Sequence, residues 1–227
     1  MDISLLDGLA TTRAIRRYTD EPVAEADLNR MLFAATRAPT GSNRQGFRFV
    51  VLRDGEKATR AKALLGESFR SSWSAKRSHD GYEQGSGENA SSPKARMAQT
   101  MQHFVDNFER TPVVVLPCIR RRHGDMTDGA SVYPACQNLL LSARALGYGG
   151  VLTMWHHAVE AELRTLLSIP DDNAIAACIP IGRPAGGHGP VRRRPLAELV
   201  YDDEWGNAAA WAVDPEGTRF TSAGPGR

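Results

Sequence analysis

Two runs of arginine are the residues in this sequence best suited to binding a charged ligand. Arg13, Arg16 and Arg17 precede a predicted helix start, and residues 192–194 form a second run near the other end of the chain. A planar guanidinium suits bidentate contact with phosphate, and the approach to a helix adds free backbone N–H groups. If the runs meet in the fold, their repulsion favours an anion between them. The pattern predicts a shared phosphomonoester site; the alternative is two unrelated surface patches, which is how we interpret the arginines at 120–122.

A polar loop over residues 38–47, APTGSNRQGF, is the third chemical feature. Its hydroxyls and amides both donate and accept hydrogen bonds, and Gly41 and Gly46 let the backbone approach a ligand. The residues with these side chains are Thr40, Ser42, Asn43 and Gln45. They match the pyrimidine edge of a flavin, where carbonyl and N–H groups alternate. Because loops are often polar, this loop alone is a weak indication of flavin binding.

Alternating helical and extended patterns must position these residues. Apolar residues at helical spacing predict helices over 4–11, 22–38, 57–65, 94–108, 132–146 and 158–167. Apolar and β-branched runs predict strands over 47–55, 111–119, 151–155 and 174–182. Residues 67–93 show no sustained period and predict a long loop, either disordered or a lid. With no repeat and no domain boundary, the pattern predicts one α/β or α+β unit.

Composition excludes several classes of protein. The 227 residues carry 28 basic and 26 acidic side chains, so the net charge of +2 gives no global footprint for nucleic acid, and the arginine runs lack interleaved aromatics. The longest apolar run, residues 113–119, is far shorter than the roughly 20 residues that cross a bilayer. The N-terminus lacks the pattern of a secretory signal. We therefore expect a cytoplasmic protein that binds neither nucleic acid nor membrane.

The cysteines and histidines do not predict a metal site. Cys118, Cys136 and Cys178 are widely spaced in apolar segments, which is typical of small buried hydrophobes. His156 and His157 are adjacent and so point in different directions, and we find no carboxylate or cysteine at ligand spacing beside them. The sequence therefore predicts no metal ligand.

Four motifs, in this order, resemble the FMN-dependent nitroreductase family. They are TRAIRRYTDEPV near the N-terminus, APTGSNRQGFRFVVLRD after one helix, ACQNLLLSARALGYGG, and IPIGRPAGG with RRRPLAELV near the end. The resemblance spans residues 9–206 and fails mainly over residues 67–107. The family often has Ser where Ala14 stands and Arg or Lys where Thr12 stands, and Gly46 and Phe47 replace the commoner Pro and Trp.

The resemblance implies a single α+β domain over residues 1–227, a three-layer sandwich with a mixed, mostly antiparallel sheet flanked by helices. It further implies an intertwined homodimer with two FMN sites at the subunit interface, a mobile lid around residues 67–107 and a C-terminal arm over residues 200–227. The residues implied to hold FMN within one subunit are Thr12, Arg13, Ala14, Arg16, Thr153, Met154, Trp155 and Arg193. Thr40, Ser42, Asn43 and Gln45 are implied to contact the FMN held by the partner subunit.

The resemblance also implies that the flavin carries the reaction. NADPH or NADH passes a hydride to the flavin and leaves, and a nitroaromatic or quinone then takes its place and receives two electrons, which gives ping-pong kinetics. No protein acid or base is required, and Arg16 is implied to lie near flavin N1 and O2 and to stabilise negative charge there. The aromatic and histidine residues expected on the acceptor side are Trp73, Tyr82, His103, Phe104 and Phe108, with core packing as the alternative for Phe104 and Phe108.

Other functions remain as alternatives at this stage. The same fold hosts reductive dehalogenation and fragmentation of the flavin to a benzimidazole, so the fold does not decide the reaction. A dehalogenase needs a charged lid that grips an amino acid, and the spacing of Glu67, Arg70 and Lys76 does not favour one. A protein that binds FMN without turnover would use the same binding residues.

Overall fold

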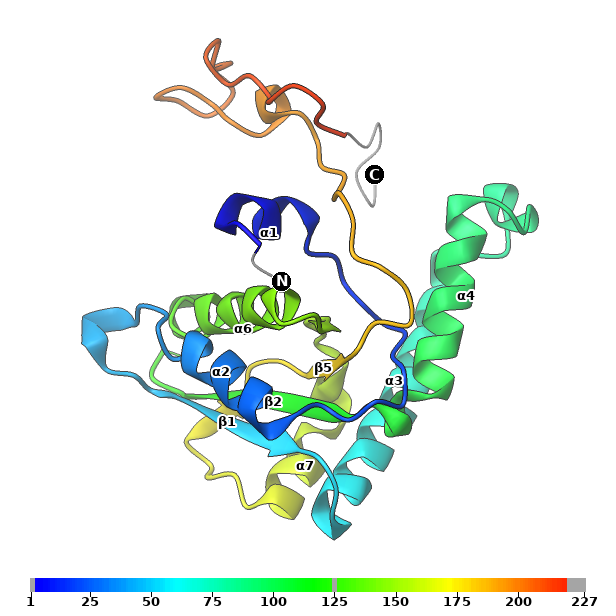
Figure 1. Ribbon diagram of the computed structural model, residues 1–227, viewed down its shortest axis with the longest axis vertical. Coiled ribbons are helices and arrows are strands. Elements are labelled where there is room, and N and C mark those ends of the chain that lie inside the picture. The colour runs from blue at the N-terminus through cyan, green and yellow to red at the C-terminus, as the bar shows by residue number, and fades with distance from the viewer. Residues whose placement is uncertain (1–2, 124–125, 220–227) are drawn as a thin grey trace.

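The computed structural model describes residues 3–123 and 126–219 (Figure 1). Within these residues one five-stranded sheet has the order β1-β2-β5-β3, with β4 beside β2, and all of its pairings are antiparallel. The strands are β1 (Phe47–Leu52), β2 (Val113–Arg120), β3 (Gly149–Gly150), β4 (Asn173–Ile175) and β5 (Ile179–Gly182). The helices are α1 (Leu5–Thr11), α2 (Glu25–Ala35), α3 (Glu56–His79), α4 (Pro93–Asp106), α5 (Met126–Gly129), α6 (Tyr133–Ala145) and α7 (Glu160–Leu167).

The central strand β2 divides the hydrophobic core into two halves. Successive side chains of a strand point to opposite faces. Val113, Val115 and Ile119 pack in the half that also contains buried residues of α2 and α6. Val114, Leu116 and Cys118 pack in the half formed with α3, α4 and α7. The predicted three-layer α+β arrangement, with helices on both faces of the sheet, is therefore confirmed (Figure 1).

Helix α3 is much longer than the sequence pattern predicted. The predicted helix ends at residue 65, whereas α3 continues to His79. Its buried face extends through Leu65, Phe69 and Trp73, which recur at i+4 and keep one stripe against the core. Because serine and charged residues fill the outer face, the polar composition concealed this stripe. The region expected to be a long loop is a helical hairpin of α3 and α4, whose helices are joined by residues 80–92.

Two predicted strands also differ from the structure. Residues 151–155 do not form a strand, although Thr153 makes one isolated bridge with Cys178, and β3 stops at Gly150. The predicted strand over 174–182 is divided into β4 and β5, which pair with opposite ends of β2. Pro117 lies in β2 between those two pairings, where it has no N–H to donate to a ladder.

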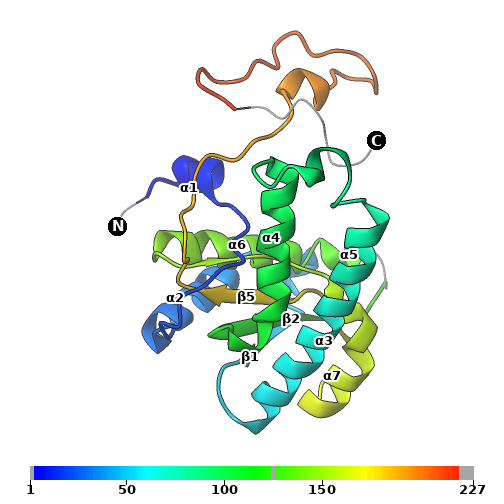
Figure 2. The same ribbon diagram turned by 90° about the vertical axis from the view of Figure 1, so that its right-hand side faces the viewer.

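Both ends of the described chain expose apolar side chains. Helix α1 forms as predicted, and Ser4 Oγ accepts from Asp7 N–H at its start. Its apolar face is open, however, with Leu6 76% exposed, and Leu5 and Leu9 are also exposed. Residues 195–219 stand away from the body in both views (Figures 1 and 2), and Trp205 there is 89% exposed. Residues 220–227 of the predicted arm lie outside the described residues.

The three cysteines are buried, as the sequence predicted. Cys118, Cys136 and Cys178 are free thiols in the core, and burial raises the pKa of Cys118 to about 11 and of Cys136 to about 12. Among the described residues, no helix has the length and apolar character needed to cross a membrane.

Candidate functional site

Two segments from opposite ends of the chain lie side by side and frame the candidate site (Figures 1 and 2). Residues 10–19 run antiparallel to residues 183–191. The backbone hydrogen bonds run from Thr19 N to Arg183 O (2.9 Å), Ala185 N to Arg17 O (2.9 Å), Gly189 N to Thr11 O (3.3 Å) and Val191 N to Ala10 O (3.0 Å). The fold thus joins the segment that carries the first arginine run to the segment that leads directly into the second.

The first arginine run has no anionic partner in the part of the chain that the structure describes. Within the described residues, the guanidinium groups of Arg13, Arg16 and Arg17 make no hydrogen bond and no ion pair. Arg16 is half-buried, and burial lowers the pKa of its guanidinium. By contrast, Arg120 pairs with Asp172 (Nε to Oδ2, 2.9 Å). A half-buried guanidinium without a carboxylate is costly unless an anion or an acceptor reaches it from outside.

Tyr18 fixes the side on which Arg16 lies. Because residues 12–19 are largely extended, Arg16 and Tyr18 share one face and Arg17 takes the other, which is the exposed one. The Tyr18 hydroxyl donates to Ile15 O (2.6 Å) and to Pro180 O (3.2 Å), and burial raises its pKa. A Cβ on Gly182 would lie 3.0 Å from the Tyr18 ring. The missing side chain therefore lets the ring pack flat against β5.

The absence of a side chain at Gly149 in β3 allows the arginine segment to approach the sheet. Ile15 N–H donates to Gly150 O (3.0 Å). A Cβ on Gly149 would lie 2.5 Å from Ile15 Cγ1, closer than real Cβ contacts occur. A side chain at position 149 would therefore push the segment that carries Arg16 away from the sheet.

The predicted loop beside the flavin ring is tied to both the sheet and helix α3. Thr153 and Cys178 exchange two backbone hydrogen bonds, of 3.0 and 2.9 Å. Ser68, buried on α3, donates from Oγ to Trp155 O (2.5 Å), and the Trp155 ring lies edge-on to Phe69 with centroids 5.5 Å apart. Met154, half-buried between them, packs against the core. The backbone of residues 153–155 is thus held from behind, with three half-buried side chains.

Three other residues were predicted to hold FMN in this part of the site: Thr12, Ala14 and Arg193. Thr12 Oγ1 donates to Gly8 O (2.6 Å) at the end of α1, and Ala14 is exposed. Arg193 is exposed just beyond the paired segments, where its Nη1 donates to Arg192 O (2.8 Å). It has no carboxylate partner within the described residues. Its position beyond Val191 places it beside α1 rather than opposite Arg13.

The polar loop predicted to contact flavin lies elsewhere on the protomer. Thr40, Ser42, Asn43 and Gln45 sit in the turn between α2 and β1, at the left of Figure 1, whereas residues 12–19 descend on the right. Ser42, Asn43 and Gln45 have φ near +50°, a left-handed conformation that is uncommon for residues other than glycine. Within one protomer the structure does not bring this loop to Arg16, so its predicted contact with the flavin of a partner subunit stays a prediction.

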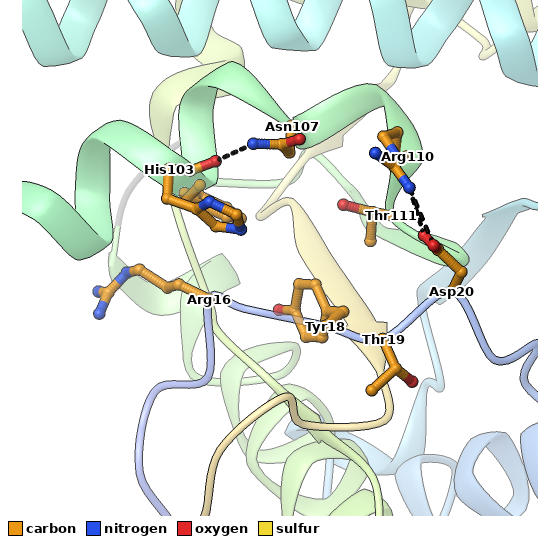
Figure 3. Close-up of a pocket in the computed structure, with 9 residues that line it drawn as sticks. Arg16, Tyr18, Thr19, Asp20, His103, Asn107, Arg110 and Thr111 are labelled. Atoms are coloured by element: carbon orange, nitrogen blue, oxygen red, sulfur yellow. Dashed lines mark hydrogen bonds and ion pairs between the residues drawn. The ribbon is translucent and has the colours of Figure 1, made fainter.

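A cavity of about 170 Å³ opens beside Arg16 (Figure 3). His103 projects into it from α4, and Asn107 follows at the end of that helix, with its amide donating to His103 O (2.9 Å). Arg110 closes one side through its ion pair with Asp20 (2.9 Å). The sequence indicated His103 as a lining residue, but it did not indicate Asn107 or Asp20, because nothing local shows that they face the arginine segment.

Of the aromatic residues expected on the acceptor side, three are buried in the core and Tyr82 is half-buried. Trp73 and Phe108 are buried in the core with Phe104, so packing accounts for them, although Phe104 also touches the cavity. Tyr82 is half-buried and lies edge-on to Trp73, with centroids 5.1 Å apart. The α3–α4 hairpin therefore contributes His103 to the cavity, while most of its aromatic side chains pack in the core.

One sequence argument about metal ligands is wrong. Glu160 stands at ligand spacing from the histidine pair, and ligand atoms of His156, His157 and Glu160 lie within 4.8 Å of one another. The carboxylate already accepts from Ile175 N–H (3.2 Å) and from Arg121 (3.3 Å). His156 is fully buried with Nε2 2.8 Å from Ile175 O. These contacts give the cluster a structural role in joining α7 to β4.

The sequence and fold of known proteins match this arrangement. The family model for the nitroreductase family matches residues 9–183. The chain belongs to the nitroreductase family. A provisionally named NADH dehydrogenase/NAD(P)H nitroreductase of Archaeoglobus fulgidus is 27% identical over 186 residues, which cover 79% of this chain and 84% of that protein.

Solved structures agree with this family membership. A provisionally named nitroreductase from Desulfovibrio desulfuricans, solved in complex with FMN, is 27% identical to this nitroreductase-family chain with a TM-score of 0.62, covering 90% of this chain and 99% of that one. A variant of an FMN- and NADPH-dependent nitroreductase from a Sphingopyxis strain has a TM-score of 0.69 at 22% identity, covering 89% of this chain and 100% of that one. The second likeness shows the shared fold.

Proposed function

We propose that this protein binds FMN and uses NADPH or NADH to reduce nitroaromatics or quinones. The observation that carries the proposal is Arg16. Its guanidinium is half-buried on a segment held by the sheet and by residues 183–191, and it has no carboxylate partner within the described residues. A flavin offers what Arg16 lacks, because a pyrimidine carbonyl can accept its hydrogen bonds and the reduced ring carries negative charge.

The residues around Arg16 fit the parts of FMN. Arg13 and Arg193, both exposed and without a carboxylate partner within the described residues, would hold the phosphate, with Thr12 and Ala14 beside them. Residues 153–155 would line the ring, and Thr40, Ser42, Asn43 and Gln45 would complete the site from a second subunit. Bound FMN would supply the two-electron redox chemistry of the proposed reaction, which the protein's own side chains lack.

The protein's own contribution is then to bind, to orient and to stabilise charge. Arg16 places a positive charge where negative charge accumulates in the reduced cofactor, and the rigid segment around Tyr18 holds it there without reorganisation. The backbone of residues 153–155 is fixed by Ser68 and by the Thr153 bridge. His103 and Asn107 would contact the acceptor in the cavity beside Arg16.

The exposed apolar surfaces support a homodimer. Leu5, Leu6 and Leu9 on α1 and Trp205 and Trp211 on the arm are open in the single chain. Large exposed apolar side chains grouped on a surface often mark an interaction site. We infer that a second copy covers it and that the arm intertwines with that copy. Free, buried cysteines fit a reducing compartment such as the cytoplasm.

The visible spectrum of the purified protein tests the proposal. We expect the bands of oxidised flavin, or their appearance after incubation with FMN and desalting, and anaerobic bleaching when NADPH or NADH is added. Nitroaromatics and quinones should then restore the bands with ping-pong kinetics. Absence of both flavin binding and nicotinamide oxidation would overturn the proposal. Bleaching that only halogenated tyrosines reverse would assign a dehalogenase instead, and binding without bleaching would assign a non-catalytic flavin protein.

A further inference from the structure

His188 links the arginine segment to the strand beneath it. Its Nδ1 accepts from Arg13 N–H (3.3 Å), and its Nε2 lies 3.1 Å from Tyr148 O. A backbone N–H can only donate and a carbonyl oxygen can only accept, so both ring nitrogens have assigned roles. Nδ1 carries the lone pair and Nε2 carries the proton. The contacts are satisfied only by the neutral imidazole in this one tautomer.

The two groups that His188 joins differ in how firmly they are held. Tyr148 is buried at 1% exposure, and its hydroxyl donates to Asp27 Oδ2 (3.0 Å). Arg13 is exposed in the turn that follows α1. Gly149, next to Tyr148, has no side chain, and a Cβ there would lie 3.1 Å from His188 Nε2. The imidazole therefore fixes an exposed backbone turn to a rigid part of the core.

The surroundings of His188 keep its ring neutral. Burial lowers the pKa of His188 most, and the positive charges of Arg144 on α6 and of Arg13 lower it further, while the contact with Tyr148 O raises it. No carboxylate among the described residues acts on this ring to oppose those effects. Protonation would place a second N–H against Arg13 N–H, so the link to the turn would be lost.

We propose that neutral His188 is a positioning residue for the phosphate end of the cofactor site, acting through the Arg13 turn. The proposal rests on the proposed function, because it concerns how this chain holds FMN. In this proposal the His188 ring sets the direction of the Arg13 backbone. That direction in turn orients the Arg13 guanidinium toward the phosphate. The ring does not need to touch the cofactor.

Three variants separate the two contacts of the ring. In His188→Asn the side-chain oxygen replaces the Nδ1 acceptor, in His188→Gln the amide nitrogen replaces the Nε2 donor, and His188→Ala keeps neither. Titrations with FMN and with riboflavin, which lacks the phosphate, give the readout. We expect His188→Ala to weaken FMN about tenfold and riboflavin less than about twofold, with His188→Asn closer to wild type than His188→Gln. Equal losses for both ligands, or Gln rescuing better than Asn, would overturn the proposal.

The pH dependence gives an independent readout that does not need the alanine variant to fold. As the pH falls below about 6.5, the ordinary pKa of histidine, wild-type affinity for FMN should fall more steeply than that of His188→Asn, because only the wild type has a ring to protonate. The phosphate of FMN titrates equally in both proteins, so the difference between the profiles isolates His188. Parallel profiles would refute the positioning role. If wild type binds neither flavin, the proposed function fails; if it binds FMN but the profiles coincide, only this inference fails.

Discussion

The two halves of the proposed cofactor site are built in different ways. The segment that carries Arg13 and Arg16 is locked between α1, β3 and residues 183–191 by backbone hydrogen bonds and by Tyr18. The loop that carries Thr40 to Gln45 is exposed, with three left-handed residues other than glycine. It is held mainly by its own contacts, such as Gln45 N–H to Thr40 Oγ1 (3.0 Å), and by one bond from Gly41 N–H to Ser131 Oγ (3.2 Å).

This difference indicates which contacts hold each half of the proposed site in its conformation. The backbone of the arginine segment is held by contacts within one chain. The loop stores a strained backbone, and strain of this kind persists at functional sites when surrounding structure over-determines it. We infer that the partner subunit and the cofactor supply the missing constraint. Substitutions in the arginine segment and in the loop test this difference between the two halves.

Arg16→Ala should have the largest effect. If Arg16 contacts the flavin ring as proposed, removing its half-buried guanidinium should weaken FMN binding about a hundredfold, the effect of losing a charge-assisted hydrogen bond or two. Arg120→Ala is the control, since it removes the same charge from an exposed ion pair with Asp172 and should change affinity little. Fluorescence quenching of FMN measures both. Equal affinities for the two variants would contradict the role given to Arg16.

A mixed dimer should show that the two halves of a site come from different chains. An Arg16→Ala protomer and an Asn43→Ala/Gln45→Ala protomer, co-expressed with different tags and purified as a heterodimer, combine one intact site with one doubly damaged site. We expect tight FMN binding to return at about one flavin per dimer, whereas neither homodimer binds tightly. No recovery would show that the loop does not act on the flavin of a partner.

Gly149→Ala should have an intermediate effect. The new methyl group would overlap Ile15 Cγ1 at 2.5 Å and press on His188, so the arginine segment must shift. We expect a loss of about 1–3 kcal/mol of folding free energy, as overpacking gives, together with weaker FMN binding. Gly186→Ala is the control because a Cβ there meets nothing within 4 Å. Urea unfolding of the apoprotein measures the free energy, and an unchanged midpoint for Gly149→Ala would contradict the close approach.

Ser42→Gly should have the smallest effect on both stability and FMN affinity. Ser42 has φ of 52°, which glycine adopts without cost. Relief of that strain, offset by greater freedom of the unfolded chain, should leave stability within about 1 kcal/mol of wild type. FMN affinity should fall slightly, because the loop loses both a hydroxyl and rigidity. Thermal unfolding with and without FMN distinguishes the two contributions.

Local periodicity explains which parts of this molecule were predictable. Helix α2 and strands β1 and β2 carry regular apolar patterns, and they lie close to the predicted ranges. The side on which Arg16 and Tyr18 lie also follows from simple alternation in an extended segment. The motifs gave the family and fold class because several occurred in the correct order. These features depend on neighbours in sequence.

The features that were missed depend on neighbours in space. The continuation of α3 to His79 needs Phe69 and Trp73 to meet a core that the polar outer face of the helix conceals. The division of the last strand depends on the pairing of both halves with β2 around Pro117. His188 and Arg13 are 175 positions apart, so no local pattern shows that the histidine is part of the site. Glu160 is an exception, because it follows His156 by four residues, a spacing that the sequence itself shows.

The pairing of residues 10–19 with residues 183–191 also sets an order of events during synthesis. The segment that carries Arg16 is synthesised early. Residues 183–191, which pair with it, are complete only when residue 191 has been added. A nascent or truncated chain that ends before β5 therefore contains Arg16 but lacks residues 183–191, which hold the Arg16 segment in place. If this site binds FMN as proposed, the cofactor binds only after residue 191 has been added, and translation products that end before β5 should not retain it.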